Sequence, residues 1–348
     1  MPMIENNKKL VDEVAGWLRI YDDDSVDRIW MGPSEVEFLV TPYHPSSEEA
    51  LEQDSIVLQD RLITMNNLDV SLRFYMPTTI DKKTTEKLPV ILHFQGGGFC
   101  ISKATWFMYY QFYSRIATTC HAVVISVSTR LAPEHRLPSA IDDGYTALLW
   151  LRSLARSDEI DVVGDKLDFS RVFLMGDSSG GNIVHEVAAR VGRDEENDCR
   201  FWSPLKLVGA IPVHPGFVRS YRSRSEMEGK EGPFLTLDML DKLLALALPV
   251  GSTKDHPFTC PMGDAAPRLE SLRLPPMMVC VSDNDLMRDT QIEYVEAMKV
   301  AGKEVHLFLN QNVDHCFYFN KMAVDHDPCV GKATDELIDV VKEFIDAH

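Results

Sequence analysis

Residues 172–182 read VFLMGDSSGGN, and this stretch decides the fold that we expect for the chain. The apolar run Val172–Met175 predicts a buried strand, and the small residues after it predict a tight turn into a helix. In the pattern Gly-x-Ser-x-Gly, the two glycines let the strand and the helix approach closely. The pattern therefore predicts that Ser178 projects above a sheet edge as a nucleophile, near the positive end of a helix. In the alternative interpretation, Ser178 only caps a glycine-rich helix start.

A second glycine-rich turn follows another apolar run upstream. Leu88–Phe94 reads LPVILHF and predicts a strand, and QGGG at residues 95–98 comes directly after it. Consecutive glycines can turn their backbone N–H groups inward. Together with the N–H group of Ser179, these groups could then bind a negatively charged oxygen. Alone, the triple glycine could be a flexible turn or a phosphate-binding loop. Neither the P-loop lysine nor a G-x-G-x-x-G pattern accompanies it, however.

A serine nucleophile needs a histidine, and the last third of the chain offers one in a suitable place. A hydroxyl attacks poorly until an imidazole removes its proton, and that imidazole needs a carboxylate to orient it. His315 follows the predicted strand Val305–Leu309. His306 lies inside that strand, and His326 and His348 lie in or near the C-terminal tail. We therefore predict that His315 is the base.

Two aspartates compete to orient that imidazole. Asp283 and Asp285 both follow the predicted strand Met277–Val281, which keeps the chain order serine, acid, histidine. Asp289 is better explained as a helix start, because TQIE at residues 290–293 resembles a capping box. The residues alone leave the choice between Asp283 and Asp285 open.

Apolar runs of strand length alternate with amphipathic stretches of helix length from residue 88 onward. Continuous apolar runs are typical of parallel strands that are covered on both faces. The alternation predicts one α/β domain over residues 1–348, with a mostly parallel central sheet flanked by helices and an antiparallel pair at its beginning. The predicted strands are Ile56–Ile63, Val70–Met76, Leu88–Phe94, Ala122–Val127, Val172–Met175, Leu207–Val213, Met277–Val281 and Val305–Leu309; the predicted helices are Tyr109–Thr118, Pro138–Leu154, Gly181–Val191, Thr290–Ala301 and Asp335–Ala347.

Two segments fall outside this alternation. Residues 215–250 hold the charged run RSYRSRSEMEGKEG, followed by the apolar helix candidate Leu237–Leu248. An insertion of this kind over a sheet edge is often a lid on a ligand site. Residues 1–20 could join it, so we expect a helical cap from these two segments. Residues 16–30, GWLRIYDDDSVDRIW, predict two short strands around a turn.

Such a cap predicts an apolar pocket over the nucleophile. Aromatic and aliphatic side chains of the insertion, and aromatic residues after the triple glycine, are candidates for its lining. Packing in the core is the alternative for each of them. The candidates are Trp106, Phe107, Tyr109, Phe217, Phe234, Leu237, Met239, Leu240 and Leu244.

Composition narrows the class of partner. The chain has 348 residues, with 35 Lys and Arg against 53 Asp and Glu, for a formal net charge of −18. Such a surface repels phosphate backbones and anionic lipids, so we expect neither nucleic acid nor membrane as a partner, but a small molecule. Seven cysteines without a C-x-x-C pair predict reduced thiols. The N-terminus has no apolar leader, so we expect a cytoplasmic location, with the nucleus as a second compartment.

The motifs also carry a resemblance to a known family. HFQGGGF (93–99), STRLAPEHRLPSA (128–140), GDSSGGN (176–182), DNDLMRD (283–289) and VDHCF (313–317) together resemble the plant carboxylesterases of the hormone-sensitive-lipase-like group. The likeness is greatest to the hypersensitivity-related esterases and extends from about residue 11 to the C-terminus. It implies an α/β-hydrolase fold with an N-terminal cap and hydrolysis of small, partly apolar esters through an acyl-enzyme. It implies neither a cofactor nor a metal.

By motif matching, the resemblance also assigns roles to residues. It places the nucleophile on Ser178, the acid on Asp285, the base on His315, and the oxyanion donors on Gly96, Gly97 and Ser179. Glu134 and Arg136 are expected to brace the floor of the site. Most of the wider family has a histidine before the triple glycine, whereas this chain has Gln95 there and His93 two positions earlier. An amide can supply similar hydrogen bonds, so this departure bears on rate and substrate preference.

Two other functions remain open alternatives. Gibberellin receptors resemble the same family but have the base replaced, so the presence of His315 disfavours a non-catalytic hormone receptor. Lyases or cyclases of specialised metabolism, among them 2-hydroxyisoflavanone dehydratases, also resemble it and use the same site. The sequence does not exclude this class, and it does not predict an oligomeric state.

Overall fold

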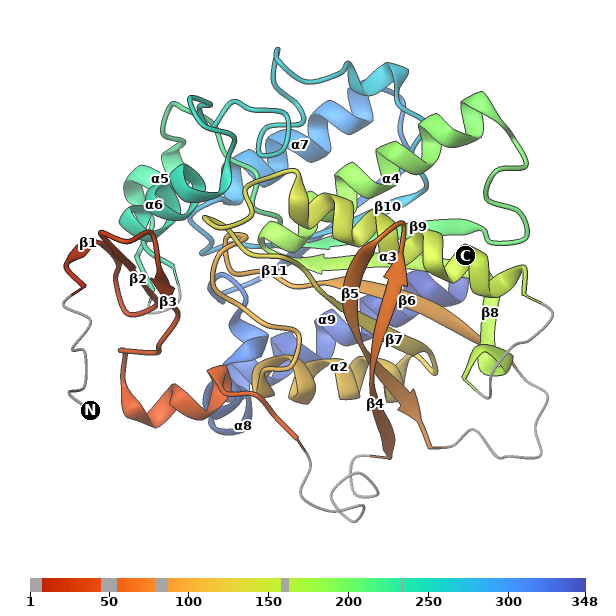
Figure 1. The fold of residues 1–348 in the computed structure, drawn as a ribbon, viewed down its shortest axis with the longest axis horizontal. Helices are drawn as coiled ribbons and strands as arrows, with labels where there is room; N and C mark the ends of the chain where they lie inside the picture. Colours follow the sequence, from red (N-terminus) through yellow and green to blue (C-terminus); the bar gives the residue numbers. More distant parts are fainter. Residues whose placement is uncertain (1–7, 45–54, 79–86, 158–162, 233–234) are drawn as a thin grey trace, which may run out of the picture.

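The computed structural model describes residues 8–44, 55–78, 87–157, 163–232 and 235–348. Its central sheet contains β4 (Ile56–Met65), β5 (Leu68–Pro77), β6 (Leu88–Phe94), β7 (Val123–Ser128), β8 (Leu167–Asp177), β9 (Leu207–Val213), β10 (Met277–Ser282) and β11 (Val305–Asn310). The strand order is β11-β10-β9-β8-β6-β7-β5-β4 (Figure 1). β5 pairs antiparallel with β4 and β7, whereas all other neighbours are parallel. The predicted mostly parallel sheet with an antiparallel pair at its beginning is therefore confirmed.

Helices cover both faces of this sheet (Figure 1). On one face α2 (Phe107–Thr119) packs against α9 (Pro328–Ala347), and on the other α3 (Ser139–Ala155) packs against α4 (Ser179–Asn197). α7 (Arg288–Val300) joins α4, because the Tyr294 hydroxyl lies 2.8 Å from Nδ1 of His185. Among the helices that the structure describes, none combines the length and the apolar character that a membrane span requires.

Burial explains why the inner strands read as continuous apolar runs. All seven residues of β6 are buried, because helices cover both faces of the strand. β11 lies at the sheet edge, and its Leu307 and Leu309 are partly exposed. The segments that follow β6, β8, β9, β10 and β11 leave the sheet at one edge, which is where ligands bind in folds of this class.

The cap differs from the expected helical one. The first described residues form a small antiparallel sheet of β1 (Leu10–Val14), β2 (Leu18–Tyr21) and β3 (Val26–Asp27). A helical cap from the N-terminus is therefore wrong for residues 8–20. The two short strands predicted within residues 16–30 are confirmed by β2 and β3, which flank a turn of acidic residues. The insertion is helical, with α5 (Arg224–Glu228) and α6 (Leu237–Ala247). Nζ of Lys242 in α6 donates to the Glu13 carbonyl oxygen at 2.8 Å, so the N-terminal sheet and α6 lie side by side (Figure 1).

The remaining elements are short. They are the 3-10 turns η1 (Ser34–Val40), η2 (Gly164–Lys166), η3 (Leu269–Ser271) and η4 (Phe317–Phe319), together with α8 (Lys321–His326).

Candidate active site

Ser178 lies on the sharp turn between β8 and α4. Its backbone has φ 51° and ψ −121°, a conformation that L-residues rarely adopt and that is concentrated at functional sites. The flanking glycines are required sterically. A Cβ on Gly176 would lie 2.4 Å from the Gly180 carbonyl oxygen, and a Cβ on Gly180 would lie 2.1 Å from that of Phe94. The turn therefore forces Ser178 outward at the sheet edge, as the sequence predicts.

His315 is oriented by a buried carboxylate. Its Nδ1 donates to Oδ2 of Asp285 at 2.6 Å, and Asp285 is only 2% exposed. Asp285 also accepts hydrogen bonds from the Met287 N–H group and from Nε2 of Gln291. The base is thus bonded to Asp285 and not to Asp283.

The acid and the base perturb each other's protonation. Burial alone would lower the pKa of His315, but the charge of Asp285 and its hydrogen bond to the imidazole outweigh burial and raise that pKa well above its usual value. Burial acts to raise the pKa of Asp285, yet the same contact with His315 lowers that pKa below its usual value. Asp285 therefore remains ionised beside the imidazole.

Ser178 and His315 both line one cavity. Since Nδ1 of His315 is occupied by Asp285, Nε2 is the nitrogen left to receive a proton. No hydrogen bond joins Ser178 to His315 in the described part of the chain. Catalytic hydrogen bonds are often long before a substrate binds, so the arrangement is compatible with proton transfer.

The triple glycine supplies two free backbone N–H groups, and Gly96 is not one of them. The Gly96 N–H group donates to the Tyr109 hydroxyl at 3.1 Å. Within the described ranges, the N–H groups of Gly97, Gly98 and Ser179 have no partner, and Ser179 is the first residue of α4. Gly97 and Gly98 have φ 83° and 58°, which favours glycine. Gly98 therefore replaces Gly96 among the expected donors.

Gln95 braces this glycine loop from inside the protein. Its Nε2 donates to the Ser102 carbonyl oxygen at 2.7 Å, and the Ser102 hydroxyl donates to the Gly96 carbonyl oxygen at 2.6 Å. Gln95 is buried. The amide thus holds the loop in place and does not reach the nucleophile through these contacts.

A buried carboxylate beneath the nucleophile is a feature that sequence reasoning missed. Oδ2 of Asp177 accepts hydrogen bonds from Nε2 of His93 and the Tyr113 hydroxyl, each at 2.7 Å. Its Oδ1 accepts from the Tyr318 hydroxyl at 2.6 Å. Asp177 is the residue before Ser178, so these contacts fix the turn from below. The position of a carboxylate at the end of an apolar strand is the feature of the sequence that could have identified Asp177.

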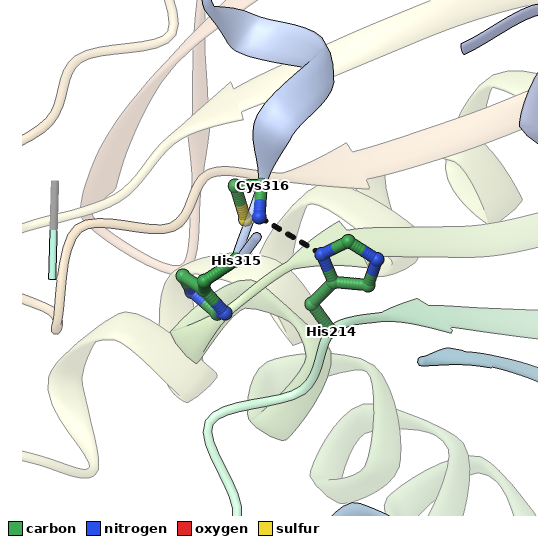
Figure 2. Close-up of side chains that lie close together, drawn as sticks. All are labelled: His214, His315 and Cys316. Carbon is green, nitrogen blue, oxygen red and sulfur yellow. Dashed lines mark hydrogen bonds between the residues drawn. The ribbon is translucent and has the colours of Figure 1, made fainter. Parts of the chain in front are cut away.

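His214 is a second missed residue, and it lies beside the base. Figure 2 shows its ring facing the loop that carries His315 and Cys316. The Cys316 N–H group donates to Nδ1 of His214 at 2.9 Å. His214 is fully buried, and burial lowers its pKa to about 4. The ring is therefore neutral near pH 7, with its proton on Nε2.

These three side chains could also be considered as metal ligands. Nitrogen and sulfur atoms of His214, His315 and Cys316 lie within 4.8 Å of one another. However, Nδ1 of His214 accepts a backbone hydrogen bond, and Nδ1 of His315 is bound to Asp285. The contacts fit a positioned base better than a metal centre.

The cavity above Ser178 has a largely apolar wall. Four of the predicted lining residues contribute to it, namely Trp106, Tyr109, Leu240 and Leu244. Sequence reasoning missed further lining residues, because they come from distant segments: Trp17, Ile101, Leu235, Leu243, Met287 and Phe319.

Other predicted lining residues lie elsewhere. The Phe107 ring packs 5.2 Å from Tyr43, and the fully buried Phe217 ring packs 4.4 Å from Tyr294, so the pocket role is wrong for both. Leu237 and Met239 are also absent from the cavity wall that the structure describes. Phe234 lies outside the described residues. These apolar side chains are explained by packing.

Glu134 and Arg136 hold the cap and do not form the floor of the cavity. Glu134 pairs with Arg28, which also donates to the carbonyl oxygens of Cys100 and Ala132. Nη1 of Arg136 donates to the carbonyl oxygens of Ala245 and Leu248, each at 2.7 Å. One loop between β7 and α3 thus anchors both the N-terminal segment and α6.

Comparisons with known proteins show the family to which the chain belongs. "Probable carboxylesterase 6" from Arabidopsis thaliana is 34% identical over 89% of this chain and 84% of that protein. "2-hydroxyisoflavanone dehydratase" from Glycyrrhiza echinata is 32% identical over 89% of this chain and 90% of that protein. The crystal structure of a thermostable esterase from Pseudomonas putida matches 81% of each chain with a TM-score of 0.67 at 22% identity, which shows the fold alone. A family model described as the alpha/beta hydrolase fold matches residues 91–319, and the chain belongs to this family.

Proposed function

We propose that the protein is a serine carboxylesterase that hydrolyses small, uncharged esters with an apolar acyl group. The observation that carries the proposal is the convergence on one cavity of Ser178 on a strained turn, His315 bonded to Asp285, and unpartnered backbone N–H groups. Carboxylesterase relatives of the chain support the same reaction class.

The first half of the reaction forms an acyl-enzyme. Nε2 of His315 removes the proton from Oγ of Ser178, which attacks the ester carbonyl carbon. The N–H groups of Gly97, Gly98 and Ser179 stabilise the negative oxygen of the tetrahedral intermediate. The intermediate collapses when the ester C–O bond breaks and His315 protonates the leaving alcohol.

The second half repeats these steps with water as the nucleophile. His315 removes a proton from water, which attacks the acyl carbon on Ser178, and the acid departs as the Ser178 hydroxyl is restored. Asp285 keeps the imidazole in the required tautomer throughout. Neither half needs a group other than the side chains and backbone of this chain.

The wall of the cavity supports an uncharged acyl group. Its charged or titratable members are Tyr109, Asp177, His315 and Cys316, and the Asp177 carboxylate is occupied by hydrogen bonds. No Lys or Arg borders the cavity in the described part of the chain, so an anionic acyl chain would lack a partner. Aliphatic and aromatic chains would be buried favourably.

Esters of graded acyl length test the proposal directly. The native protein should hydrolyse p-nitrophenyl acetate, butyrate and octanoate, and Ser178→Ala should lower kcat by about 10³-fold or more. Ser170→Ala is the matched control, because Ser170 is an exposed serine of the same strand, β8. Equal rates for the native protein and Ser178→Ala would contradict the proposal.

An elimination of the dehydratase type is the second candidate function, since a dehydratase is among the similar proteins. Elimination would use His315 as a base but would form no bond to Ser178. A fluorophosphonate that reacts covalently with Ser178 therefore separates the two reactions. Esterase activity requires labelling that Ser178→Ala abolishes, whereas dehydration that persists in Ser178→Ala would favour the elimination.

A further inference from the structure

A second cavity adjoins the first one. The two cavities share His315 and Leu235 in their walls, so the base borders both. The segment after β10, the loop before His315, α8 and the beginning of α9 form the remaining wall, together with residues 230 and 232 of the insertion. Ser178 and the free N–H groups of the glycine loop border only the first cavity.

The two cavities differ in chemistry. The first is lined largely by apolar side chains, whereas half of the residues that line the second have polar side chains. Lys230, Asn284, Asn312 and Asp314 line the second cavity where it opens to solvent. All four are exposed, and their side chains form no hydrogen bond or ion pair with the rest of the described structure. The cavity thus offers an ammonium, two amides and a carboxylate to a ligand.

Not all polar residues of this wall are available. Asn320 caps α8 by accepting from the Ala323 N–H group, and Asp327 caps α9 by accepting from the Cys329 N–H group. Their roles are local and structural. Phe317 adds an aromatic surface to the same wall.

The chemistry of acyl transfer assigns the two halves of an ester to different sides of the base. The carbonyl oxygen must reach the N–H groups of Gly97, Gly98 and Ser179, which keeps the acyl chain in the first cavity. The leaving oxygen must receive its proton from Nε2 of His315. The alcohol therefore starts at the residue that separates the two cavities.

We propose that the second cavity binds the alcohol half of the substrate and that this alcohol is uncharged and rich in hydroxyl groups. This inference rests on the proposed esterase function. As Oγ of Ser178 bonds to the acyl carbon, the bond between that carbon and the alcohol oxygen breaks, and the His315 proton moves to this oxygen. The freed alcohol is then already inside the second cavity.

The free side chains argue for the class of alcohol. A hydroxyl group both donates and accepts hydrogen bonds, and amides, a carboxylate and an ammonium supply partners for both roles. Lys230 and Asp314 carry opposite charges, and the carboxylate of Asp327 is compensated by the N-terminus of α9, so the cavity favours neither an anionic nor a cationic alcohol. A purely aliphatic alcohol would leave these groups without a partner when it displaced their water.

Two esters that differ only in hydroxyl groups provide the test. 2,3-Dihydroxypropyl butyrate and n-propyl butyrate have the same acyl chain and the same alcohol carbons. We expect kcat/KM of the native protein to be about tenfold higher for the dihydroxypropyl ester, as two additional hydrogen bonds would give. Equal values for the two esters would overturn the inference.

A double variant tests whether the preference for the dihydroxypropyl ester arises in the second cavity. Lys230→Met and Asn284→Leu keep side-chain size but remove two of the free polar groups, so together they should reduce the ratio of the two kcat/KM values about tenfold. Lys299→Met is the control, because Lys299 lies on α7 and pairs there with Glu296. A preference that the double variant leaves intact would place the alcohol elsewhere.

A third ester tests the proposed esterase function independently of the alcohol site. p-Nitrophenyl butyrate reports hydrolysis without requiring a hydroxyl-rich alcohol. If the native protein hydrolyses it with Ser178 dependence but shows no preference between the two alkyl esters, the alcohol site alone is wrong. If none of the three esters is hydrolysed, the proposed esterase function fails and the alcohol site with it.

Discussion

Non-glycine residues with positive φ lie at the nucleophile, beside the base and directly after the strand next to them, and Phe99 in the cavity wall is a further one. Ser178, His214 and Cys316 have φ 51°, 46° and 52°. Such conformations cost about 1–3 kcal/mol each and persist only where other contacts hold them. The N–H groups of Ser178 and His214 donate to the neighbouring strands, and the Cys316 N–H group donates to the ring of His214. His214 therefore links the end of β9 to the residue after the base.

The His214 contact leads to a prediction about rate. His214→Phe keeps a ring but leaves the Cys316 N–H group without its acceptor, so kcat should fall about tenfold or more with little change in KM. His214→Asn should retain most of kcat, because an amide oxygen can accept and Asn tolerates positive φ. Steady-state rates normalised to fluorophosphonate-titrated sites measure both. Equal kcat for His214→Phe and the native protein would contradict the role.

Single residues show where sequence reasoning reaches its limit. Ser178 and His315 could be predicted, because motif, chain order and strand ends constrain them, whereas the choice of Asp285 over Asp283 came only from the resemblance to a known family. The N–H groups that stabilise the oxyanion could not be predicted from the sequence. Whether Gly96 or Gly98 is free depends on the Tyr109 hydroxyl, which α2 brings to the Gly96 N–H group. His214 lacks any local motif, and its role appears only when β9 and the loop after β11 are adjacent.

At the scale of elements, one loop controls the position of the cap. The segment between β7 and α3 contains Arg136, which donates to two carbonyl oxygens at the C-terminal end of α6. The last carbonyls of a helix lack partners within it, so an arginine there both caps and anchors the helix. Leu240, Leu243 and Leu244 of α6 line the first cavity. The anchor therefore determines the shape of the acyl site.

Loss of this anchor should affect long acyl chains most. In Arg136→Met, α6 loses two hydrogen bonds, so its leucines should pack less firmly on a bound chain. We expect kcat/KM for p-nitrophenyl octanoate to fall about tenfold more than for the acetate, which is too short to need α6. Arg156→Met is the matched control, because Arg156 binds carbonyl oxygens of residues 200, 201 and 203. A uniform loss for both esters would contradict this explanation.

Strands and helices could be predicted where a local run of apolar residues defines them. The apolar runs of β6, β7, β9, β10 and β11 coincide with the predicted strands to within one residue at each end. β8 begins at Leu167, five residues before the predicted start, because the polar residues Asp168, Ser170 and Arg171 interrupt its apolar run. The N-terminal sheet replaces the expected helical cap. Its contact with α6 and the stacking of Trp17 on Trp106 join distant segments, which no local pattern reports.

At the scale of the whole molecule, burial and the charge of Asp285 set the pH range of activity. The base must be neutral, and the pKa of His315 is raised well above its usual value. The fall of kcat/KM toward acid should therefore be centred above about pH 6.5, the ordinary imidazole value. Asp285→Asn should move this fall to lower pH and reduce kcat by about 10⁴-fold. A native profile that remains flat down to pH 6 would contradict the coupling.

Stability should depend on pH through histidines that lie away from the nucleophile. His185 is buried in α4, and burial lowers its pKa to about 4. Between pH 4 and 6.5 the unfolded chain therefore binds a proton that the folded chain does not, and stability is lost as pH falls through this range. From pH 7 to pH 5 this one group accounts for about 2 kcal/mol of the free energy of unfolding.

Replacing that histidine isolates its contribution from the other titrating groups. His185→Phe preserves a ring in the same space but cannot bind the proton. Urea unfolding of both proteins at pH 7 and pH 5 should show that the variant loses about 2 kcal/mol less than the native protein on acidification. The loss of the Tyr294 contact lowers the stability of the variant at both pH values, so it cancels in this difference. An unchanged pH dependence would mean that His185 gains its proton in the folded state.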